Sequence, residues 1–345
     1  MPTIGIIGAG AAAATATFVL DSTLPDAEIT VLEKSGGVCG RAATRRRGDL
    51  VYDYGANYLK SDDERVVELV TETLDDDGLV DAVEPIDTFD ESGTVSPGRE
   101  ADEHNWSYRS GLTQIAKRLF GRTDAMVTRR IRVETIRRTD ETWSLLDTDG
   151  GSWGPFDVLV LNPPAPQTAA LLSDAEWGDP RRERLREAVA EVSYRTVWTA
   201  VLYYPFEIDR PYYGLINTDK EHVVGWISRE ECKTGHVPDG EALLVVQAND
   251  EWSTTHYDDD PARNVATLAG HAADVIGDDR LRSPEWTDHQ GWLYALPESG
   301  VRHGPLSSAE AVNIYCLGDW VAGEGRLHAA LRNGLDVGER IVHGL

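Results

Sequence analysis

"TIGIIGAGAAAATATFVL", residues 3–20, is the stretch that decides the fold of this chain. A short apolar, β-branched run leads into a glycine turn and then into alanines, which favour a helix. Gly8 and Gly10 permit a tight turn and a close approach of the backbone to a ligand, and Ala13 is small enough to let helix and strand pack closely. The helix start, at Ala11, offers free N–H groups and a positive dipole end to a pyrophosphate. The stretch therefore predicts a strand–turn–helix unit that binds a dinucleotide.

A second strand is predicted at residues 28–34, "EITVLEK". It carries Glu33, which lies 23 residues after Gly10, about the spacing of a carboxylate that accepts hydrogen bonds from a ribose. Lys34 follows directly and is counted with the predicted ligand contacts. A GxGxxA pattern alone is weak, but strand, turn, helix, strand and terminal glutamate in one βαβ unit are specific. NAD and FAD both bind such units, so either dinucleotide fits this pattern.

Acidic residues outnumber basic residues in this chain. The 345 residues include 59 Asp and Glu against 33 Lys and Arg, which gives a formal net charge of −26. This charge argues against nucleic acid and anionic membranes as partners. The hydrophobic fraction of 41% predicts a globular protein with a substantial core, in one large domain or two of ordinary size. Abundant carboxylates with few lysines resemble the proteins of extreme halophiles, in which carboxylates maintain hydration at high salt.

The sequence carries no clear membrane, metal or disulfide signal. No apolar run is long enough to span a bilayer, and the N-terminal stretch lacks the basic residues of a signal peptide, so we expect a cytoplasmic protein. Cys39, Cys232 and Cys316 are far apart, and no CxxC or Cys/His metal spacing occurs. We therefore expect neither a disulfide framework nor a metal site.

Two further motifs indicate which dinucleotide is bound. "EKSGGVCGRAATRR", residues 33–46, places Arg41 shortly after the second strand. "IYCLGDW", residues 314–320, is predicted to be a strand that ends in Gly318 and Asp319. Together with the N-terminal unit, these motifs resemble those of the FAD-dependent amine oxidase superfamily.

The resemblance implies that FAD is the cofactor. No Cys or His stands where it would invite covalent attachment, so we expect FAD to be held without a covalent bond. The resemblance places Arg41 against the FAD pyrophosphate and Asp319 on the ribityl chain. It also places the start of a helix, at about Leu327, against the flavin O2/N1 edge, where the helix dipole favours negative charge. Two positions depart from the family pattern. Cys39 stands where the family has the first glycine of a pair, and Ala329 adds a methyl group where the family backbone nears the flavin.

The resemblance also assigns two segments between these motifs. Residues 55–58 pass the flavin ring, and the backbone at Val133 grips the adenine. The complete predicted set of cofactor-binding residues is Gly8, Gly10, Ala11, Ala13, Glu33, Lys34, Gly40, Arg41, Gly55, Ala56, Asn57, Val133, Gly318, Asp319, Leu327 and His328.

Three segments narrow the resemblance to the renalase-like branch of the superfamily. Residues 224–257 carry a Trp-bearing strand, a Lys-Gly loop and an "EWS" element near a histidine, while "DHQGWLYALP" (288–297) and "NPPAPQTAALL" (162–172) are similar to other elements of that branch. The matching residues in the first two segments are Trp226, Lys233, Gly235, Trp252, Ser253, His256, His289, Trp292, Tyr294 and Ala295. The substrate-side candidates are Tyr58, Trp292 and Tyr294, and no catalytic residue is assigned.

The expected fold class is α/β. A Rossmann-like FAD-binding domain of the two-dinucleotide-fold type is interrupted by an inserted α+β substrate domain that contains an antiparallel sheet. Asp260 followed by Pro261 predicts the start of a helix in the inserted domain. The predicted FAD-binding domain comprises residues 1–60, 106–165 and 285–345, and the predicted substrate domain comprises residues 61–105 and 166–284.

The expected activity is that of an FAD-dependent oxidoreductase of the oxidase type. By resemblance, it accepts a hydride at flavin N5 from a small donor such as a dihydronicotinamide species and passes the electrons to oxygen. Two alternatives stay open: an amine oxidase or desaturase of the same superfamily, and a flavin-binding protein without turnover. An amine oxidase commonly uses a lysine–water pair near N5, and Lys60 and Lys233 are the candidates for that role. The oligomeric state is left open.

Overall fold

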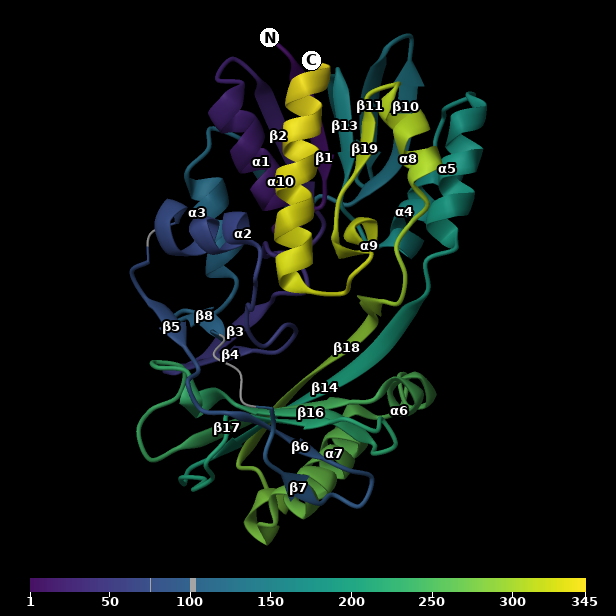
Figure 1. Ribbon diagram of the computed structural model, residues 1–345. Coiled ribbons are helices and arrows are strands. Elements are labelled where there is room, and N and C mark those ends of the chain that lie inside the picture. The colour runs from purple at the N-terminus through teal and green to yellow at the C-terminus, as the bar shows by residue number, and fades with distance from the viewer. Residues whose placement is uncertain (75, 100–103) are drawn as a thin grey trace.

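The structure, a computed structural model, describes residues 1–74, 76–99 and 104–345. An upper part with a helix-covered parallel sheet stands above a second, larger sheet (Figure 1). Two long strands, β14 and β18, rise from the lower sheet toward the upper part, and both chain termini lie at the top (Figure 1). The two parts therefore face each other across the region that these long strands span.

The upper sheet is parallel and has the strand order β19–β13–β1–β2–β9. Its register pairs Ile4 with both Val158 and Ile29, which places the N-terminal strand at the centre. Side chains of β1 alternate between two cores, since Ile4 and Ile6 belong to one and Ile7 to the other. The strands are β1 (Thr3–Ile7), β2 (Glu28–Glu33), β9 (Met126–Arg129), β13 (Val158–Leu161) and β19 (Ile314–Cys316).

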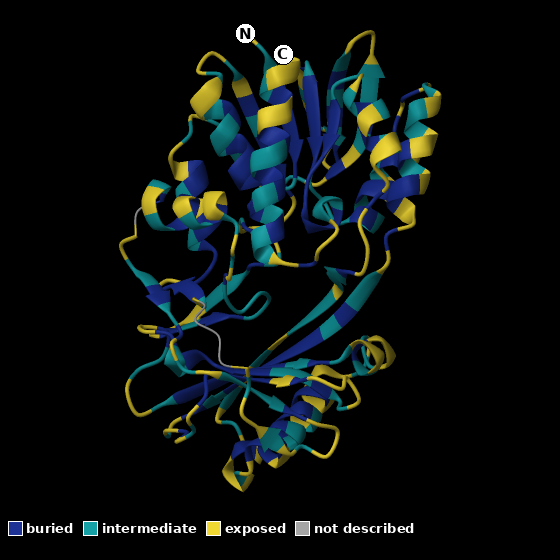
Figure 2. Ribbon diagram, viewed as in Figure 1, coloured by how far each residue is buried: buried dark blue, intermediate teal, exposed yellow. Residues whose placement is uncertain are grey.

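Helices cover both faces of the upper sheet (Figure 1). Helices α1, α3 and α10 contribute to one core, and α4, α5 and α8 contribute to the other. Figure 2 shows that the strands of this sheet are buried while the outward faces of the helices are exposed. These helices are α1 (Ala11–Thr23), α3 (Gln114–Gly121), α4 (Ala165–Ser173), α5 (Pro180–Ala190), α8 (His303–Glu310) and α10 (Leu327–Gly344).

The lower sheet has the strand order β18–β14–β17–β16–β15–β6–β7. It is antiparallel except for the parallel pair β6–β15. Helix α7 (Pro261–Ile276) covers one face, and it begins as predicted, with the Asp260 carboxylate accepting a hydrogen bond from the Ala262 N–H. The strands are β6 (Ile86–Phe89), β7 (Val95–Ser96), β14 (Tyr194–Tyr204), β15 (Gly214–Asn217), β16 (Val224–Arg229), β17 (Ala242–Ala248) and β18 (Trp286–Pro297).

Shorter elements connect these layers. A three-stranded sheet has the order β10–β11–β12, and two hairpin-like pairs are β3–β4 and β5–β8. Within the three described ranges, no helix is long and apolar enough to cross a membrane. The remaining elements are β3 (Thr44–Arg47), β4 (Leu50–Asp53), α2 (Glu64–Glu68), η1 (Leu69–Thr73), β5 (Leu79–Asp81), β8 (Trp106–Tyr108), β10 (Val133–Thr139), β11 (Thr142–Asp147), β12 (Ser152–Phe156), η2 (Glu230–Cys232), α6 (Asp250–Thr255), η3 (Asp279–Arg282) and α9 (Asp319–Ala322).

The predicted α/β class, with a Rossmann-like unit and an antiparallel sheet, is confirmed. Several elements pack in a different layer from the one that the predicted boundaries gave them. Helices α4 and α5, expected in the substrate domain, pack in a core of the upper sheet, and β18, expected in the FAD-binding domain, pairs with β14 in the lower sheet. The apolar face of a helix and the alternation of apolar and polar residues in a strand do not predict which sheet the element will join. The division into an FAD-binding and a substrate domain stays a prediction.

Candidate functional site

A cavity of about 2260 Å³ lies between the carboxyl ends of the upper parallel strands and one face of the lower sheet. Open α/β sheets commonly bind ligands at that end of their strands. A pocket for one drug-sized ligand occupies roughly 300–1,000 Å³, so this cavity has room for a cofactor and a second molecule. All the predicted cofactor-binding and substrate-side residues line it except Ala13, which is fully buried in α1 and packs in the core.

The turn after β1 forms one end of the cavity. The Gly10 N–H donates to Asn162 Oδ1 at 3.0 Å, and a methyl group on Gly10 would lie 2.5 Å from that same oxygen. The second amide atom of Asn162, Nδ2, donates to the carbonyl oxygen of Leu317 at 3.3 Å. Asn162 thus ties together the ends of β1, β13 and β19. Sequence reasoning did not select Asn162, although its place directly after a buried strand could have indicated it.

Glu33 ends β2 beside this turn and is 8% exposed. Its Oε2 accepts from the Ala9 N–H at 2.8 Å, and its Oε1 accepts from the N–H and the hydroxyl of Ser35 at 2.7 and 2.6 Å. A carboxylate can accept about four hydrogen bonds, so capacity remains for a ribose hydroxyl. Lys34 lies next to it and donates to Gln167 at 2.8 Å. Burial lowers the pKa of Lys34, and the charge of Arg132 lowers it further.

The loop between β2 and β3 crosses over the turn. Cys39 adopts the left-handed backbone conformation, with φ of 80°, and its N–H donates to the carbonyl oxygen of Ala9 at 2.8 Å. A glycine would take that conformation without strain, which matches the family glycine expected here. The thiol points into the core, and burial raises the pKa of Cys39 to about 12. A protonated thiol is a poor nucleophile, so Cys39 is unsuited to covalent attachment of a ligand.

Arg41 follows this loop and pairs with Asp319 across the cavity wall. Arg41 Nη2 lies 2.6 Å from Asp319 Oδ1, and Arg41 Nη1 lies 2.9 Å from Asp319 Oδ2. Arg41 Nη1 also donates to the carbonyl oxygen of Ala295, in β18, at 2.7 Å. The loop after β2, the turn after β19 and the long strand β18 therefore meet at one guanidinium. The predicted contacts of these two side chains with pyrophosphate and ribityl groups stay predictions.

The start of α10 forms another part of the wall. Leu327 and His328 line the cavity, and the first N–H groups of an α-helix have no partner within the helix. Ala329 is fully buried and does not line the cavity, so its extra methyl group packs in the core rather than facing a ligand. The Gly318 N–H donates to Asn333 Oδ1 at 2.9 Å, which fixes the turn after β19 to this helix.

Residues 54–58 pass through the middle of the cavity wall. The Ala56 N–H donates to the carbonyl oxygen of Arg41 at 3.0 Å. A methyl group on Gly55 would lie 2.0 Å from that carbonyl oxygen, so the position has no room for a side chain. From the lower sheet, Gln247 Nε2 donates to the carbonyl oxygen of Gly55 at 2.8 Å. Contacts from both parts of the molecule thus hold this segment.

The lower sheet supplies the opposite wall. Its lining side chains are uncharged, and several of them carry an aromatic ring or an amide group. The ring of Trp292 stacks on Tyr54, with centroids 5.4 Å apart, and its Nε1 donates to the carbonyl oxygen of Tyr54 at 3.2 Å. Tyr294 makes an edge contact with Tyr194 at 5.7 Å. The lining side chains from this sheet are Val197, Ile216, Trp226, Gln247, Gln290, Trp292, Leu293, Tyr294, Ala295 and Leu296.

The two lysines considered for an amine oxidase role differ in position. Lys60 lines the cavity. Lys233 is fully buried and is not among the lining residues, because its ammonium pairs with two buried carboxylates. Lys233 is therefore not placed to hold a water molecule against a ligand in the cavity.

Comparisons with known proteins agree with this arrangement. Residues 6–73 match the family model of the NAD(P)-binding Rossmann-like domain. Renalase from Mus musculus is 28% identical to the chain over 178 residues, which cover 50% of this chain and 49% of that protein. The match thus spans about half the length of this curated relative.

Solved structures share the fold over nearly the whole chain. A protein from Exiguobacterium sp. 255-15, named as a candidate protoporphyrinogen oxidase, superposes with a TM-score of 0.79 at 14% identity, covering 100% of this chain and 99% of that one. Putrescine oxidase reaches 0.74 at 13% identity, covering 99% and 100%. Cyclohexylamine oxidase from Brevibacterium oxydans IH-35A reaches 0.73 at 13% identity, covering 99% of each chain. The resemblance that the motifs indicated, to renalase and to the amine oxidases, is confirmed.

Proposed function

We propose that this chain, which shares sequence with renalase and its fold with amine oxidases, is an FAD-dependent oxidoreductase of the oxidase type. FAD is bound without a covalent bond and receives a hydride from a small donor such as a dihydronicotinamide species. Oxygen is the electron acceptor that the kinship with oxidases suggests. One observation carries the proposal: a dinucleotide-type turn and an uncharged aromatic wall face the same cavity.

The residues of the upper part fit FAD. The turn at Gly8 and Gly10 lines the cavity at the start of α1, where a helix favours a pyrophosphate, and Glu33 retains acceptor capacity for a ribose. The guanidinium of Arg41 lines the cavity between this turn and the start of α10. The start of α10 supplies partial positive charge for the flavin ring edge. When bound, FAD supplies a hydride acceptor that the amino acid side chains lack.

The lower wall supports the choice of donor. Hydride transfer requires mainly a donor stacked close to the acceptor, and planar aromatic side chains favour a planar donor. Trp226 and Trp292 supply such surfaces, and the amides of Gln247 and Gln290 supply hydrogen-bond donors and acceptors. The charges of an aliphatic amine or a carboxylate have no opposite charge among these four side chains. These residues bind and orient the donor and exclude water from it.

The amine oxidase alternative keeps one supporting observation. Lys60 lines the cavity, and a lysine-assisted oxidation of an amine requires a lysine there. Aromatic side chains such as Trp226 also attract cations. Lys233, the other candidate for this role, pairs with two buried carboxylates and is therefore not available to an amine in the cavity.

Anaerobic flavin reduction tests the proposal. The purified protein, supplemented with FAD, is mixed without oxygen with dihydronicotinamides in one series and with aliphatic and aromatic amines in another. Rapid loss of the flavin absorbance with a dihydronicotinamide, and its return when oxygen is admitted, is the expected result. Loss with amines alone favours the amine oxidase alternative. Bound flavin that no donor reduces favours a protein without turnover, and failure to bind FAD refutes the proposal.

A further inference from the structure

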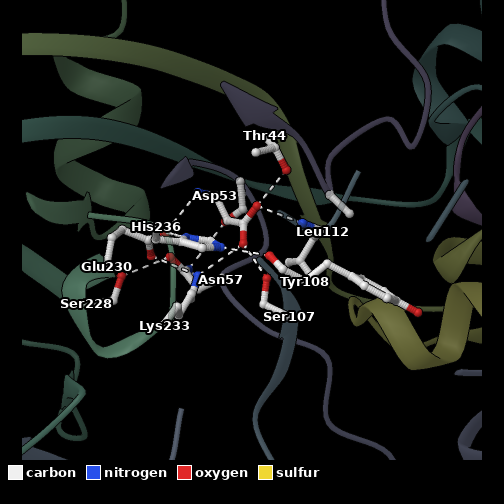
Figure 3. A network of polar contacts seen from close by, with 12 residues as sticks. Thr44, Asp53, Asn57, Ser107, Tyr108, Leu112, Ser228, Glu230, Lys233 and His236 are labelled. Carbon is white, nitrogen blue, oxygen red and sulfur yellow. Dashed lines mark hydrogen bonds and ion pairs between the residues drawn. The ribbon is translucent and has the colours of Figure 1, made fainter. Parts of the chain in front are cut away.

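Four ionisable side chains meet in the interior, away from the cavity surface. Asp53, Glu230, Lys233 and His236 are all fully buried. Figure 3 shows them pointing toward one another. Lys233 Nζ lies 3.1 Å from Asp53 Oδ2 and 2.8 Å from Glu230 Oε1, and His236 Nδ1 lies 2.9 Å from Glu230 Oε2. We call these four residues the buried ion cluster.

Both ring nitrogens of His236 have partners. Its Nε2 lies 2.9 Å from the carbonyl oxygen of Tyr108, which can only accept, so Nε2 carries a proton. Its Nδ1 lies 2.9 Å from Glu230 Oε2, which also accepts from the Asp53 N–H at 3.0 Å. The imidazole therefore links β8 to the segment that carries Glu230.

The carboxylate of Asp53 is the most heavily bonded member of the cluster. Its Oδ1 accepts from the Thr44 hydroxyl at 2.6 Å and from the Leu112 N–H at 2.9 Å, and its Oδ2 accepts from the Ser107 hydroxyl at 2.8 Å (Figure 3). Burial alone raises the pKa of Asp53, but the charges of Lys233 and His236 and these hydrogen bonds outweigh it and lower that pKa. Asp53 is therefore held in one position and one charge state.

The cluster anchors the chain just before the segment that passes through the cavity wall. Asp53 ends β4, and its N–H and that of Val51 donate to Glu230 Oε2 and to the carbonyl oxygen of His236, at 3.0 and 2.8 Å. Glu230 and His236 belong to the loop that follows β16 of the lower sheet. Residues 54–58 follow Asp53 directly, so the cluster sets the point from which they enter the cavity.

A second set of contacts holds the other end of that segment. The Tyr213 hydroxyl donates to the carbonyl oxygen of Asn57 at 3.3 Å, and the Ser228 hydroxyl donates to Asn57 Oδ1 at 3.1 Å. Tyr213 is fully buried, and its ring centroid lies 5.8 Å from the Lys233 ammonium. Burial raises the pKa of Tyr213, so its hydroxyl keeps the proton that it donates. One residue thus contacts both the buried ion cluster and a residue that lines the cavity.

The energetic cost of such a cluster argues for a role beyond stability. Removing charges from water is expensive, and apolar residues of similar volume often stabilise a fold equally well. In some proteins, buried ionic groups are retained because they fix position and register. Here the fixed positions are those of Asp53 and, through Tyr213, Asn57.

We propose that Lys233 is a positioning residue for the reaction: through the buried ion cluster and Tyr213 it holds Asn57 and its neighbours at the flavin. Lys233 contacts neither cofactor nor substrate and acts through these side chains alone. The inference rests on the proposed function, because it requires a flavin in the cavity. The Lys-Gly loop of the renalase-like motif would thus position the residues near the flavin and take no part in the reaction itself.

Variants of Tyr213, Ser228 and Lys233 test this role with measurements that a loss of stability alone does not change. Tyr213→Phe removes one hydroxyl and Ser228→Ala removes the other, while the buried ion cluster stays in place. We expect each variant to bind FAD at the wild-type stoichiometry, to shift the flavin absorbance spectrum, and to lower the rate of flavin reduction at saturating donor about threefold. Lys233→Met, which keeps the length of the side chain but removes the charge, should lower that rate at least tenfold, and Lys233→Arg should restore part of it.

A matched control separates positioning from loss of stability. Leu268→Ala removes a fully buried side chain from α7, on the face of the lower sheet that is covered by that helix. It should lower the melting temperature while leaving the flavin spectrum and reduction rate of the loaded protein unchanged. If Lys233→Met does not fold, the Tyr213 and Ser228 variants still decide the question.

The outcomes distinguish this inference from the proposed function. Unchanged spectra and reduction rates in Tyr213→Phe and Ser228→Ala overturn the positioning role while leaving a flavin enzyme intact. Equal changes of the flavin spectrum and the reduction rate in Leu268→Ala also overturn it, because a loss of stability would then be enough to cause them. Wild-type protein that binds no added FAD overturns the proposed function itself, and the positioning role falls with it.

Discussion

The guanidinium of Arg41 and the carboxylate of Asp319 form a two-bond ion pair although 278 residues separate them in the chain. The nearer of the two contacts, Nη2 to Oδ1, is 2.6 Å. The pair lies in the cavity wall and joins the loop after β2 to the turn after β19. Two-bond arginine–carboxylate pairs fix geometry as well as charge, and lysine does not reproduce them.

Replacement of Arg41 should weaken FAD binding. Arg41→Ala removes a cationic donor from the cavity, and a hydrogen bond to a charged group contributes about 1.5–3 kcal/mol. Each 1.4 kcal/mol corresponds to about tenfold in affinity, so we expect affinity to fall by at least tenfold, measured by titration of the apoprotein with FAD. Arg47→Ala is the matched control, since Arg47 lies over the ring of Trp286 and does not line the cavity. Equal affinity of both variants would refute the role of Arg41.

Cys39→Gly should be tolerated. Residue 39 has a φ of 80°, a conformation that costs a residue with a side chain roughly 1–2 kcal/mol, and glycine relieves this strain. The substitution also removes the packing contacts of the thiol, which contribute a similar amount to stability. We expect flavin content to be unchanged and the free energy of unfolding to change by less than about 1 kcal/mol. Cys39→Val places a β-branched side chain at the same φ. Backbone strain and overpacking should then add, and we expect that free energy to fall by more than about 2 kcal/mol. Denaturant unfolding of the three proteins checks this order, and a Val variant as stable as the Gly variant would contradict it.

The stability of the protein should lose the contribution of Asp53 in acid. The folded-state pKa of Asp53 lies below the ordinary value of about 3.9. This ionised group therefore stabilises the fold fully above about pH 4, and the contribution disappears as the pH falls through the lower folded-state pKa. Asp53→Asn should be less stable than wild type by about 3 kcal/mol at pH 7, and this gap should shrink below pH 4.

Urea unfolding at constant salt, from pH 7 to pH 2, measures that gap. Asp279→Asn is the control, because the Asp279 side chain is 91% exposed and should show a small, constant difference from wild type. A constant gap for Asp53→Asn across the whole pH range would show that Asp53 does not titrate as stated.

Gly334→Ala should disrupt the contact between α1 and α10. The added methyl group would lie 2.4 Å from the carbonyl oxygen of Ala12 and 2.7 Å from Thr15 Cβ, so the helices must separate. Overpacking of this kind typically costs about 1–3 kcal/mol of the free energy of unfolding. Gly121→Ala, at the end of α3 with no atom within 4 Å of the new methyl group, should change it by less than about 0.5 kcal/mol. Similar stability of the two variants would argue against tight packing of α1 on α10.

Trp292→Leu should weaken donor binding while FAD binding is retained. Trp292 lines the lower wall and stacks on Tyr54. Loss of an aromatic stacking surface costs about 1 kcal/mol or more, so KM for the donor should rise about fivefold or more. Trp286→Leu, on the same strand but outside the lining set, should leave KM unchanged. Steady-state kinetics of both variants, with flavin content measured in parallel, decide between a substrate wall and core packing.

The cofactor end of the cavity could be read from local sequence. Gly8, Gly10, Glu33 and Arg41 line the cavity because a turn, a strand end and a short loop follow from neighbouring residues. Asn162 was missed because its role depends on β1, β13 and β19 meeting side by side. Gln247 was missed for a similar reason, since strand alternation does not say which face of a sheet will line a cavity.

The sequence by itself determined the βαβ unit, the glycine turn and the carboxylate at the end of β2, because these features depend on contacts between residues close in the chain. Only the tertiary structure decided that Arg41 meets Asp319, and that Lys233 lies within the buried ion cluster and does not line the cavity. Charges are placed by partners that arrive from distant segments, and the desolvation of each charge makes those partners obligatory.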